Sequence, residues 1–182
     1  MRVTVDMRQF RRISPRLEAR IAGVLYLVSI LLGIIAMTLI SRGRHAQGDQ
    51  ANLVAAVLYT GLTVLLWDLL RPVNYWLSTA AAICSLAGCW LPQSWFRAAH
   101  TSNFLFFGLY CLLIGYLIVR SRLFPAAVGV LMACAGVCWL TTMWPRLAHA
   151  TLPYTTAIGL LGEGTLMVWL LVKGPDPTRV PE

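Results

Sequence analysis

Charged residues are scarce in this chain. They make up 12% of the 182 residues, whereas an average soluble domain has roughly 25%. Hydrophobic residues, in contrast, make up 58%. This composition excludes an ordinary water-soluble domain, and the apolar segments leave no length for a second one. The net charge of +8 does not point to nucleic acid either, because the basic residues are not gathered on one face.

The chain also lacks the short motifs that mark common enzymes. It contains no P-loop, no G-x-G-x-x-G, no H-E-x-x-H and no G-x-S-x-G. Its five cysteines form no C-x-x-C pair, which argues against a thiol–disulfide enzyme and favours small packing residues. We therefore expect no cofactor, and catalysis, if any, must depend on residues outside these motifs.

What the sequence does contain is six long apolar stretches. A hydrocarbon core of ~30 Å needs ~20 helical residues, and each stretch has about that length. Because unpaired backbone groups are too costly in lipid, each is expected to be an α-helix. The prediction is an all-α membrane bundle of six transmembrane helices. Their approximate ranges are 21–40, 51–70, 73–91, 103–119, 124–144 and 154–172.

The basic residues orient this bundle. Eleven Lys or Arg residues fall on the side of the N-terminus and four on the other side. The four are Arg42, Arg44, Arg97 and Arg146. The positive-inside rule then predicts that both termini are cytoplasmic, N-in and C-in. We expect a basic tail at 1–20, the transmembrane domain at 21–174 and a short tail at 175–182.

Several short strings occur together along the chain. They are Arg20–Tyr26, Leu70–Asn74, Phe107–Leu109, Gly115–Ile118, Arg120–Ser121, Phe124–Pro125, Gly129–Leu131, Ala135–Gly136, Gly162–Glu163 and Trp169–Gly174. From residue 20 to residue 174 the chain thus resembles a family of multi-pass bacterial membrane proteins catalogued as domain of unknown function 4386. The resemblance implies a bacterial inner membrane and no agreed activity.

Glu163 is the most informative single residue, since it lies near the middle of the last predicted span. A charge at that depth costs ~2.5–3.5 kcal/mol on insertion scales, so such residues usually face the bundle interior. The helix face around Glu163 carries small residues, namely Thr155, Gly159 and Gly162, which indicates close packing against another helix. We expect Glu163 to be protonated, or to share a proton, at neutral pH. It serves either as an acid/base or cation ligand, or as a neutral partner in hydrogen bonds between helices.

A second polar group lies near the cytoplasmic end of the second span. Asp68 and Arg71 are three residues apart, a spacing that brings opposite charges onto one helix face. Asn74 follows directly. With Arg20 and Arg120 these residues are a candidate site for an anionic lipid headgroup or a phosphate. A two-carboxylate mechanism with Glu163 is disfavoured, because the depths of Asp68 and Glu163 differ by ~10 Å.

The remaining candidates lie on the outer half. His45, His100 and His149 share one side of the membrane, but they come from separate elements, and we expect no metal site. Asn103 and Phe107 follow His100 along one face of the fourth span, which forms either a pocket wall or core. Three aromatic residues are deep enough to contribute to a site around Glu163, and these are Phe107, Tyr110 and Trp139.

Three functions stay open. The first is a non-enzymatic bundle that binds a lipid or small hydrophobic ligand or supports a partner. The second is a small proton- or cation-coupled transporter centred on Glu163, which would need an oligomer. The third is an enzyme acting on a lipophilic, isoprenoid-like substrate, with Glu163 as acid/base and aromatic faces around a cationic intermediate. The expected partners are membrane lipids and a second copy or another membrane protein, and not nucleic acid.

Overall fold

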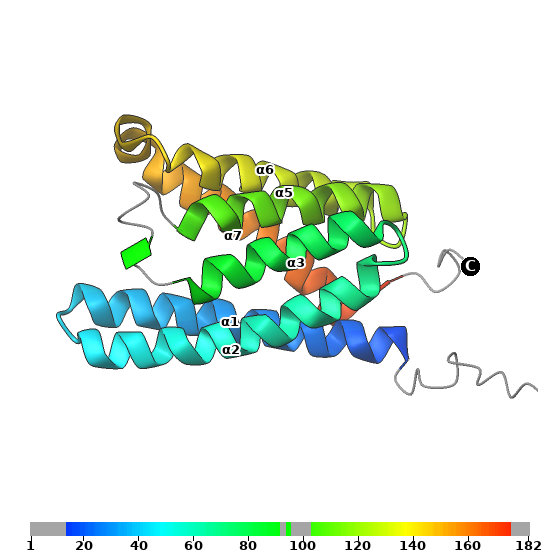
Figure 1. Ribbon diagram of the computed structural model, residues 1–182, viewed down its shortest axis with the longest axis horizontal. Coiled ribbons are helices and arrows are strands. Elements are labelled where there is room, and N and C mark those ends of the chain that lie inside the picture. The colour runs from blue at the N-terminus through cyan, green and yellow to red at the C-terminus, as the bar shows by residue number, and fades with distance from the viewer. Residues whose placement is uncertain (1–13, 92–93, 96–102, 176–182) are drawn as a thin grey trace, which may run out of the picture.

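The protein is an all-helical bundle in the computed structural model, which describes residues 14–91, 94–95 and 103–175. Six long helices account for nearly all of these residues, and no strand occurs among them (Figure 1). The predicted all-α fold of six helices is confirmed. The helices are α1 Pro15–Ser41, α2 His45–Leu70, α3 Tyr75–Trp90, α5 Asn103–Ser121, α6 Ala126–Thr141 and α7 Pro145–Val172.

Four of the helices are long and apolar enough to cross a membrane, namely α1, α2, α5 and the Pro153–Val172 part of α7. α6 is also apolar, but like α3 it has only 16 residues. At 1.5 Å per residue, 16 residues span about 24 Å, less than the ~30 Å of a hydrocarbon core. Two of the six predicted spans are therefore shorter than expected.

Two helices begin earlier than the spans predicted at 51–70 and 154–172. α2 begins at His45 and α7 at Pro145, so residues 45–50 and 145–153 are helical as well. The α1–α2 turn needs few residues because Gly43 adopts a φ of +76°, a conformation that glycine takes without strain. Pro145 suits the first turn of a helix, where no backbone N–H is required. α1 begins at Pro15, and the Ser14 side chain caps it by accepting a hydrogen bond from the backbone N–H of Leu17.

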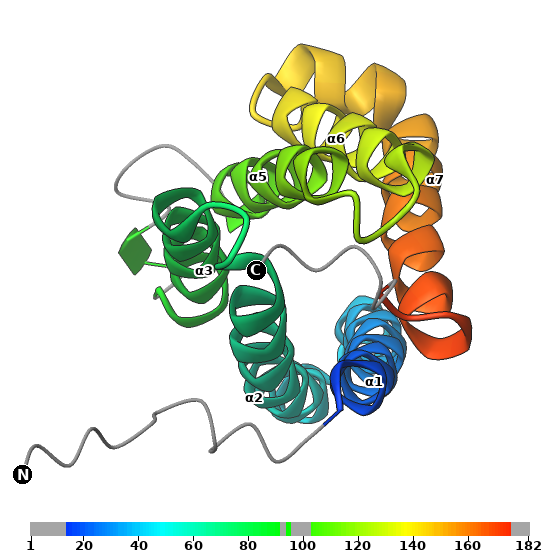
Figure 2. The same cartoon turned by 90° about the vertical axis from the view of Figure 1, so that its right-hand side faces the viewer.

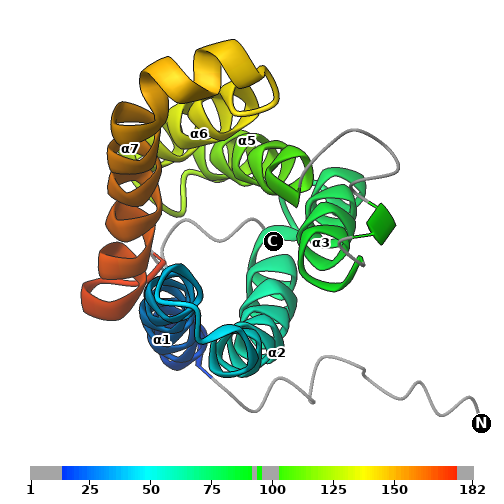
Figure 3. The same ribbon diagram turned by 90° about the vertical axis from the view of Figure 1, so that its left-hand side faces the viewer.

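The six helices form a closed ring (Figures 2 and 3). Each helix contacts the next along the chain, and α7 returns to contact α1. Across the ring, contacts are sparse, with α2 and α5 meeting only briefly. The beginning of α1 and the end of α7 lie at the same end of the bundle (Figure 1), together with the α2–α3 and α5–α6 turns. The interior of this ring is where the site lies.

Small residues let neighbouring helices approach closely. A Cβ atom on Gly115 would lie 2.6 Å from the carbonyl oxygen of Gly129, and one on Gly136 would lie 2.7 Å from that of Gly108. Gly129 and Gly136 thus allow the close α5–α6 contact. Gly33 on α1 has no such role, because a Cβ there would meet nothing within 4 Å.

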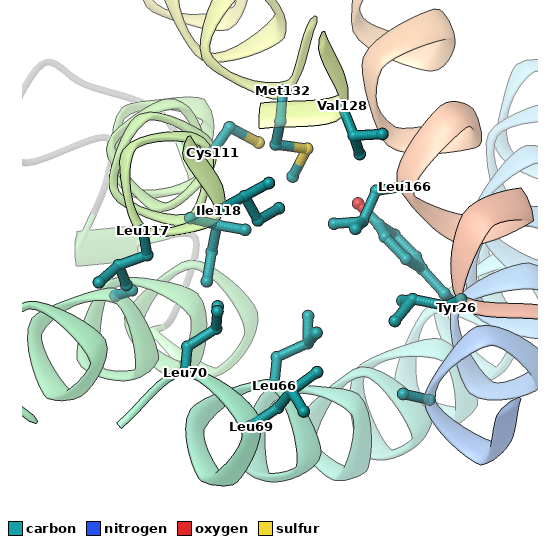
Figure 4. Close-up of a cluster of buried hydrophobic side chains, with 14 of the residues drawn as sticks. Tyr26, Leu66, Leu69, Leu70, Cys111, Leu117, Ile118, Val128, Met132 and Leu166 are labelled. Atoms are coloured by element: carbon teal, nitrogen blue, oxygen red, sulfur yellow. The ribbon is translucent and has the colours of Figure 1, made fainter. Parts of the chain in front are cut away.

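Buried apolar side chains line the interior of the ring toward the end where α1 begins and α7 ends. Figure 4 shows several of them, from α2, α5, α6 and α7, around the middle of the bundle. The largest of them are almost fully buried: Leu66, Leu70, Ile114, Leu117, Ile118, Met132, Leu166 and Leu170. We call these eight residues the apolar plug. On the outside of the bundle, large hydrophobic residues such as Met37, Ile83 and Val137 are exposed, as expected of a surface covered by lipid.

Candidate functional site

Glu163 lies inside the bundle on α7, with only 5% of its surface exposed. Both carboxyl oxygens accept a hydrogen bond from another helix. The hydroxyl of Tyr26 on α1 donates to Oε2 over 3.2 Å, and the indole Nε1–H of Trp139 on α6 donates to Oε1 over 3.1 Å. The acid therefore links α7 to the preceding helix α6 and to α1 at the other end of the chain, and it faces the interior as its depth suggests.

Glycines on α7 make this arrangement sterically feasible. A Cβ on Gly159 would lie 2.5 Å from Cζ2 of Trp139, so only glycine leaves room for the indole one turn before Glu163. A Cβ on Gly162 would lie 2.5 Å from the carbonyl oxygen of Leu131 on α6. The two glycines thus bring α6 and α7 together and place the indole N–H within reach of the carboxyl group.

Aromatic rings surround the acid. The ring of Tyr59 on α2 lies 5.8 Å from that of Tyr26 and 6.0 Å from that of Tyr110. On the other side of the acid, Trp139 stacks on Phe104 with the ring centroids 4.9 Å apart. Separations of 4.5–7 Å are typical of favourable aromatic pairs.

Phe107 joins the two groups of rings. Its centroid is 6.1 Å from that of Tyr59 and 5.8 Å from that of Trp139. We call the six residues Tyr26, Tyr59, Phe104, Phe107, Tyr110 and Trp139 the aromatic cluster.

Two hydroxyl groups in the aromatic cluster are buried without a partner. Tyr59 and Tyr110 are 9% and 1% exposed, and neither hydroxyl forms a hydrogen bond within the part of the chain that the structure describes. A buried polar group left unpaired costs about 1–3 kcal/mol, and most such groups in native proteins are satisfied. The hydroxyls therefore indicate that a water molecule or a ligand completes the site.

A pocket of about 370 Å³ leads to Glu163. It extends from Asn52 and Asn103, near the first turns of α2 and α5, toward the middle of the bundle, and it is partly open to the surroundings. We call it the central pocket. Its wall comes from α1, α2, α3, α5 and α7 and consists of Ser29, Ile30, Asn52, Ala55, Ala56, Tyr59, Ser85, Gly88, Cys89, Leu91, Asn103, Phe104, Phe107 and Glu163.

The wall of the central pocket is apolar with a few uncharged polar groups. Ser85 shares a hydrogen bond of 2.6 Å with Thr63, and the Ser29 hydroxyl donates to the carbonyl oxygen of Leu25. Glu163 is the one charged residue among the wall residues given above, and neither Lys nor Arg is among them. A mainly apolar pocket with few polar groups is typical of small-molecule sites.

Three of the predicted site residues lie together with Glu163. Trp139 donates to its carboxyl group, Tyr110 belongs to the aromatic cluster, and Asn103 lies on the pocket wall. Sequence reasoning missed the roles of Tyr26 and Tyr59. Tyr26 carried a signal, since it lies on the small-residue face of the first span with Ala22 and Ser29, a face that turns out to be buried.

The other three predicted residues lie elsewhere. Asp68 and Arg71 form the expected ion pair, with 2.6 Å between Oδ1 and Nη2, and the Arg71 guanidinium lies 5.0 Å from the centre of the Trp67 ring. Asn74 caps α3 by accepting a hydrogen bond from the backbone N–H of Leu77. None of the three is among the wall residues of the central pocket. Their binding of a lipid headgroup stays a prediction.

The histidine positions are only partly described. His45 begins α2, while His100 and the side chain of His149 lie outside the described residues. Among the residues whose positions are described, no group of three His, Cys, Asp or Glu side chains is arranged to hold a metal ion.

The fold and the site define an all-helical protein with four helices apolar enough to cross a membrane and a pocket that reaches a buried acid. Residues 91–174 match the family model described as Domain of unknown function (DUF4386). This match confirms the predicted resemblance over α5, α6 and α7, while residues 20–90 lie outside it. No curated protein and no solved structure matches the chain.

Proposed function

We propose that this protein binds a small hydrophobic ligand within the bilayer, in the central pocket. The observation that carries the proposal is a pocket of about 370 Å³ whose mainly apolar wall includes the buried acid Glu163 and the ring of Tyr59. Pockets for small molecules usually occupy ~300–1,000 Å³ and combine an apolar wall with a few polar groups that orient the ligand. The volume fits a small molecule better than a whole phospholipid.

The proposal also covers the membrane location and the orientation of the protein. The protein is a multi-pass component of a bacterial inner membrane, with both termini in the cytoplasm and lipids, and a second copy or another membrane protein, as its neighbours. The exposed apolar surface and the excess of basic residues on the terminal side support this orientation. In this orientation the central pocket opens toward the outer side.

The two alternative functions, an enzyme and a transporter, have less support in the geometry of the site. An enzyme would use Glu163 as acid/base, with Phe107, Tyr110 and Trp139 around a cationic intermediate. A transporter would need a route past Glu163, where Leu66 and Leu166 of the apolar plug are fully buried. Transport would therefore require a second conformation, whereas binding needs only the one observed.

Blocking the central pocket tests the proposal. Gly88 lies on the pocket wall, and a Cβ there would lie 3.6–3.8 Å from Asn103, Phe106 and Phe107 of α5, so a leucine adds bulk where α3 meets α5 beside the pocket. Gly33→Leu is the matched control, because it makes the same change where nothing lies within 4 Å. The full chain and both variants are purified from membranes in detergent, and co-purifying small molecules are extracted and identified by mass spectrometry.

We expect one compound to accompany the unmodified protein and Gly33→Leu, and Gly88→Leu to retain roughly tenfold less, equivalent to about 1.4 kcal/mol of binding free energy. Thermal unfolding of the two variants checks that both are folded. Equal amounts of the compound in all three samples, or no compound above a detergent blank, would contradict the proposed function.

A further inference from the structure

We propose that the ligand of the central pocket is a small amphipathic amine, whose ammonium group pairs with Glu163 and whose apolar body lies against the aromatic cluster. This inference rests on the proposed function and names the chemical class of its ligand. It depends on three features of the pocket: its charge, its aromatic wall and its unpaired hydroxyl groups.

The carboxylate of Glu163 favours a cationic ligand in the central pocket. Glu163 is the charged member of the wall residues, and within the described part of the chain it accepts hydrogen bonds from two uncharged donors, Tyr26 and Trp139. No salt bridge joins Glu163 to a basic side chain among these described residues. A buried carboxylate without a cationic partner is strongly unfavourable, and a bound cation removes that cost. An anionic ligand would be repelled.

The carboxyl group retains room for such a partner. Each carboxylate oxygen has two lone pairs, so four acceptor sites exist and the two observed donors use one on each oxygen. An ammonium group that enters the pocket can therefore bind Glu163 without displacing Tyr26 or Trp139. The two existing hydrogen bonds hold the carboxyl group in place for it.

The aromatic wall favours an organic cation over a bare metal ion. Tyr59, Phe104 and Phe107 line the pocket, and ring faces attract alkylammonium groups through cation–π interactions. A metal ion would instead need several oxygen, nitrogen or sulfur ligands. Around Glu163 the described residues offer no such group of ionisable ligands.

The unpaired hydroxyl of Tyr59 supplies the second polar contact. Tyr59 lies on the pocket wall, is largely buried, and packs its ring against that of Tyr26, whose hydroxyl binds Glu163. A tyrosine hydroxyl can accept a hydrogen bond from an ammonium N–H. An amine thus satisfies two groups of the site at once, the carboxylate and an otherwise orphaned hydroxyl.

A matched pair of ligands tests the inference. 2-Phenylethylamine is cationic at neutral pH, and 2-phenylethanol has nearly the same size and shape but no charge. Binding of each to the full chain in lipid nanodiscs is measured by isothermal titration calorimetry. We expect the amine to bind at least roughly tenfold more tightly than the alcohol. In Glu163→Gln, which keeps the size of the side chain, the two affinities should become equal.

Each outcome of this binding experiment leads to one conclusion. Equal affinities for amine and alcohol in the unmodified protein would overturn the inference and leave the proposed function intact. Binding of neither compound at millimolar concentration would contradict the proposed function as well. An amine preference that survives in Glu163→Gln would show that another group holds the charge. The comparison in the unmodified protein decides the question even if the variant fails to fold.

Discussion

The Glu163 side chain is held by two donors from two other helices, and each of these hydrogen bonds has a separate structural basis. Trp139 reaches the acid because Gly159 leaves room for its indole, whereas Tyr26 reaches it from α1 across the α1–α7 contact. Hydrogen bonds between helices in membranes typically contribute about 0.6 kcal/mol and at most about 1.7 kcal/mol. The acid is therefore better understood as a positioned functional group than as a major source of stability.

Removing one donor tests this view. Tyr26→Phe deletes the hydroxyl and leaves the ring, so we expect the free energy of unfolding to fall by about 0.5–1.5 kcal/mol. Tyr116→Phe is the control, since Tyr116 is half exposed on the outside of α5 and should change stability little. Unfolding in mixed micelles of SDS measures both. Equal stability of the two variants would contradict a structural hydrogen bond between Tyr26 and Glu163.

A second residue-scale prediction concerns Gly159. Gly159→Ala would place a Cβ 2.5 Å from the Trp139 indole and force that ring away from Glu163. We expect the variant to lose amine binding by roughly tenfold or more while remaining helical. Gly164→Ala, where a Cβ meets nothing within 4 Å, is the control on the same helix. Unchanged amine binding in Gly159→Ala would show that the position of the Trp139 indole does not matter for binding.

At the scale of the helices, glycines on both sides let α5 and α6 approach each other closely. Gly115 and Gly129 oppose each other, and each Cβ would lie 2.6 Å from the other residue's carbonyl oxygen. Overpacking at such a contact costs about 1–3 kcal/mol. We expect Gly115→Leu to lower the free energy of unfolding by at least that amount, and Gly33→Leu to lower it little. Similar stabilities in the SDS assay would show that α5 and α6 do not pack this closely.

The helices themselves were largely predictable from sequence, because apolar length dictates where lipid forces the backbone to pair with itself. Their ends were not. The hydrophobic pattern stops at the membrane boundary, whereas α2 and α7 continue into polar sequence, from His45 and from Pro145. A helix end depends on local capping and turn geometry, such as the left-handed conformation of Gly43. Hydropathy does not predict these local features.

For the molecule as a whole, short connections predicted which helices are neighbours along the chain, but not how the ring closes. The α1–α7 contact joins the two ends of the bundle and brings Tyr26 to Glu163. This is why Glu163 and Trp139 were identified from sequence while the roles of Tyr26 and Tyr59 were missed. A mid-span acid is conspicuous on chemical grounds, but the tyrosines around it look like any buried aromatic residue.

The orientation of the whole molecule gives a further prediction. Because basic residues concentrate on the side of the termini, a fluorescent protein fused to the C-terminus should fold in the cytoplasm and be bright in a bacterial host. Alkaline phosphatase fused at the same site should be inactive there, since it needs the oxidising periplasm. The reverse result, a dark fluorescent protein and an active phosphatase, would show that the bundle has the opposite orientation and that the central pocket opens toward the cytoplasm.

The most direct measurement of the central claim is an experimental structure of the full chain in nanodiscs with 2-phenylethylamine. The account predicts density for the amine in the central pocket, with its nitrogen within hydrogen-bonding distance of the Glu163 carboxyl group and its ring against Phe107. Density for the ligand only on the lipid-facing surface, or a Glu163 side chain turned outward to the acyl chains, would contradict it.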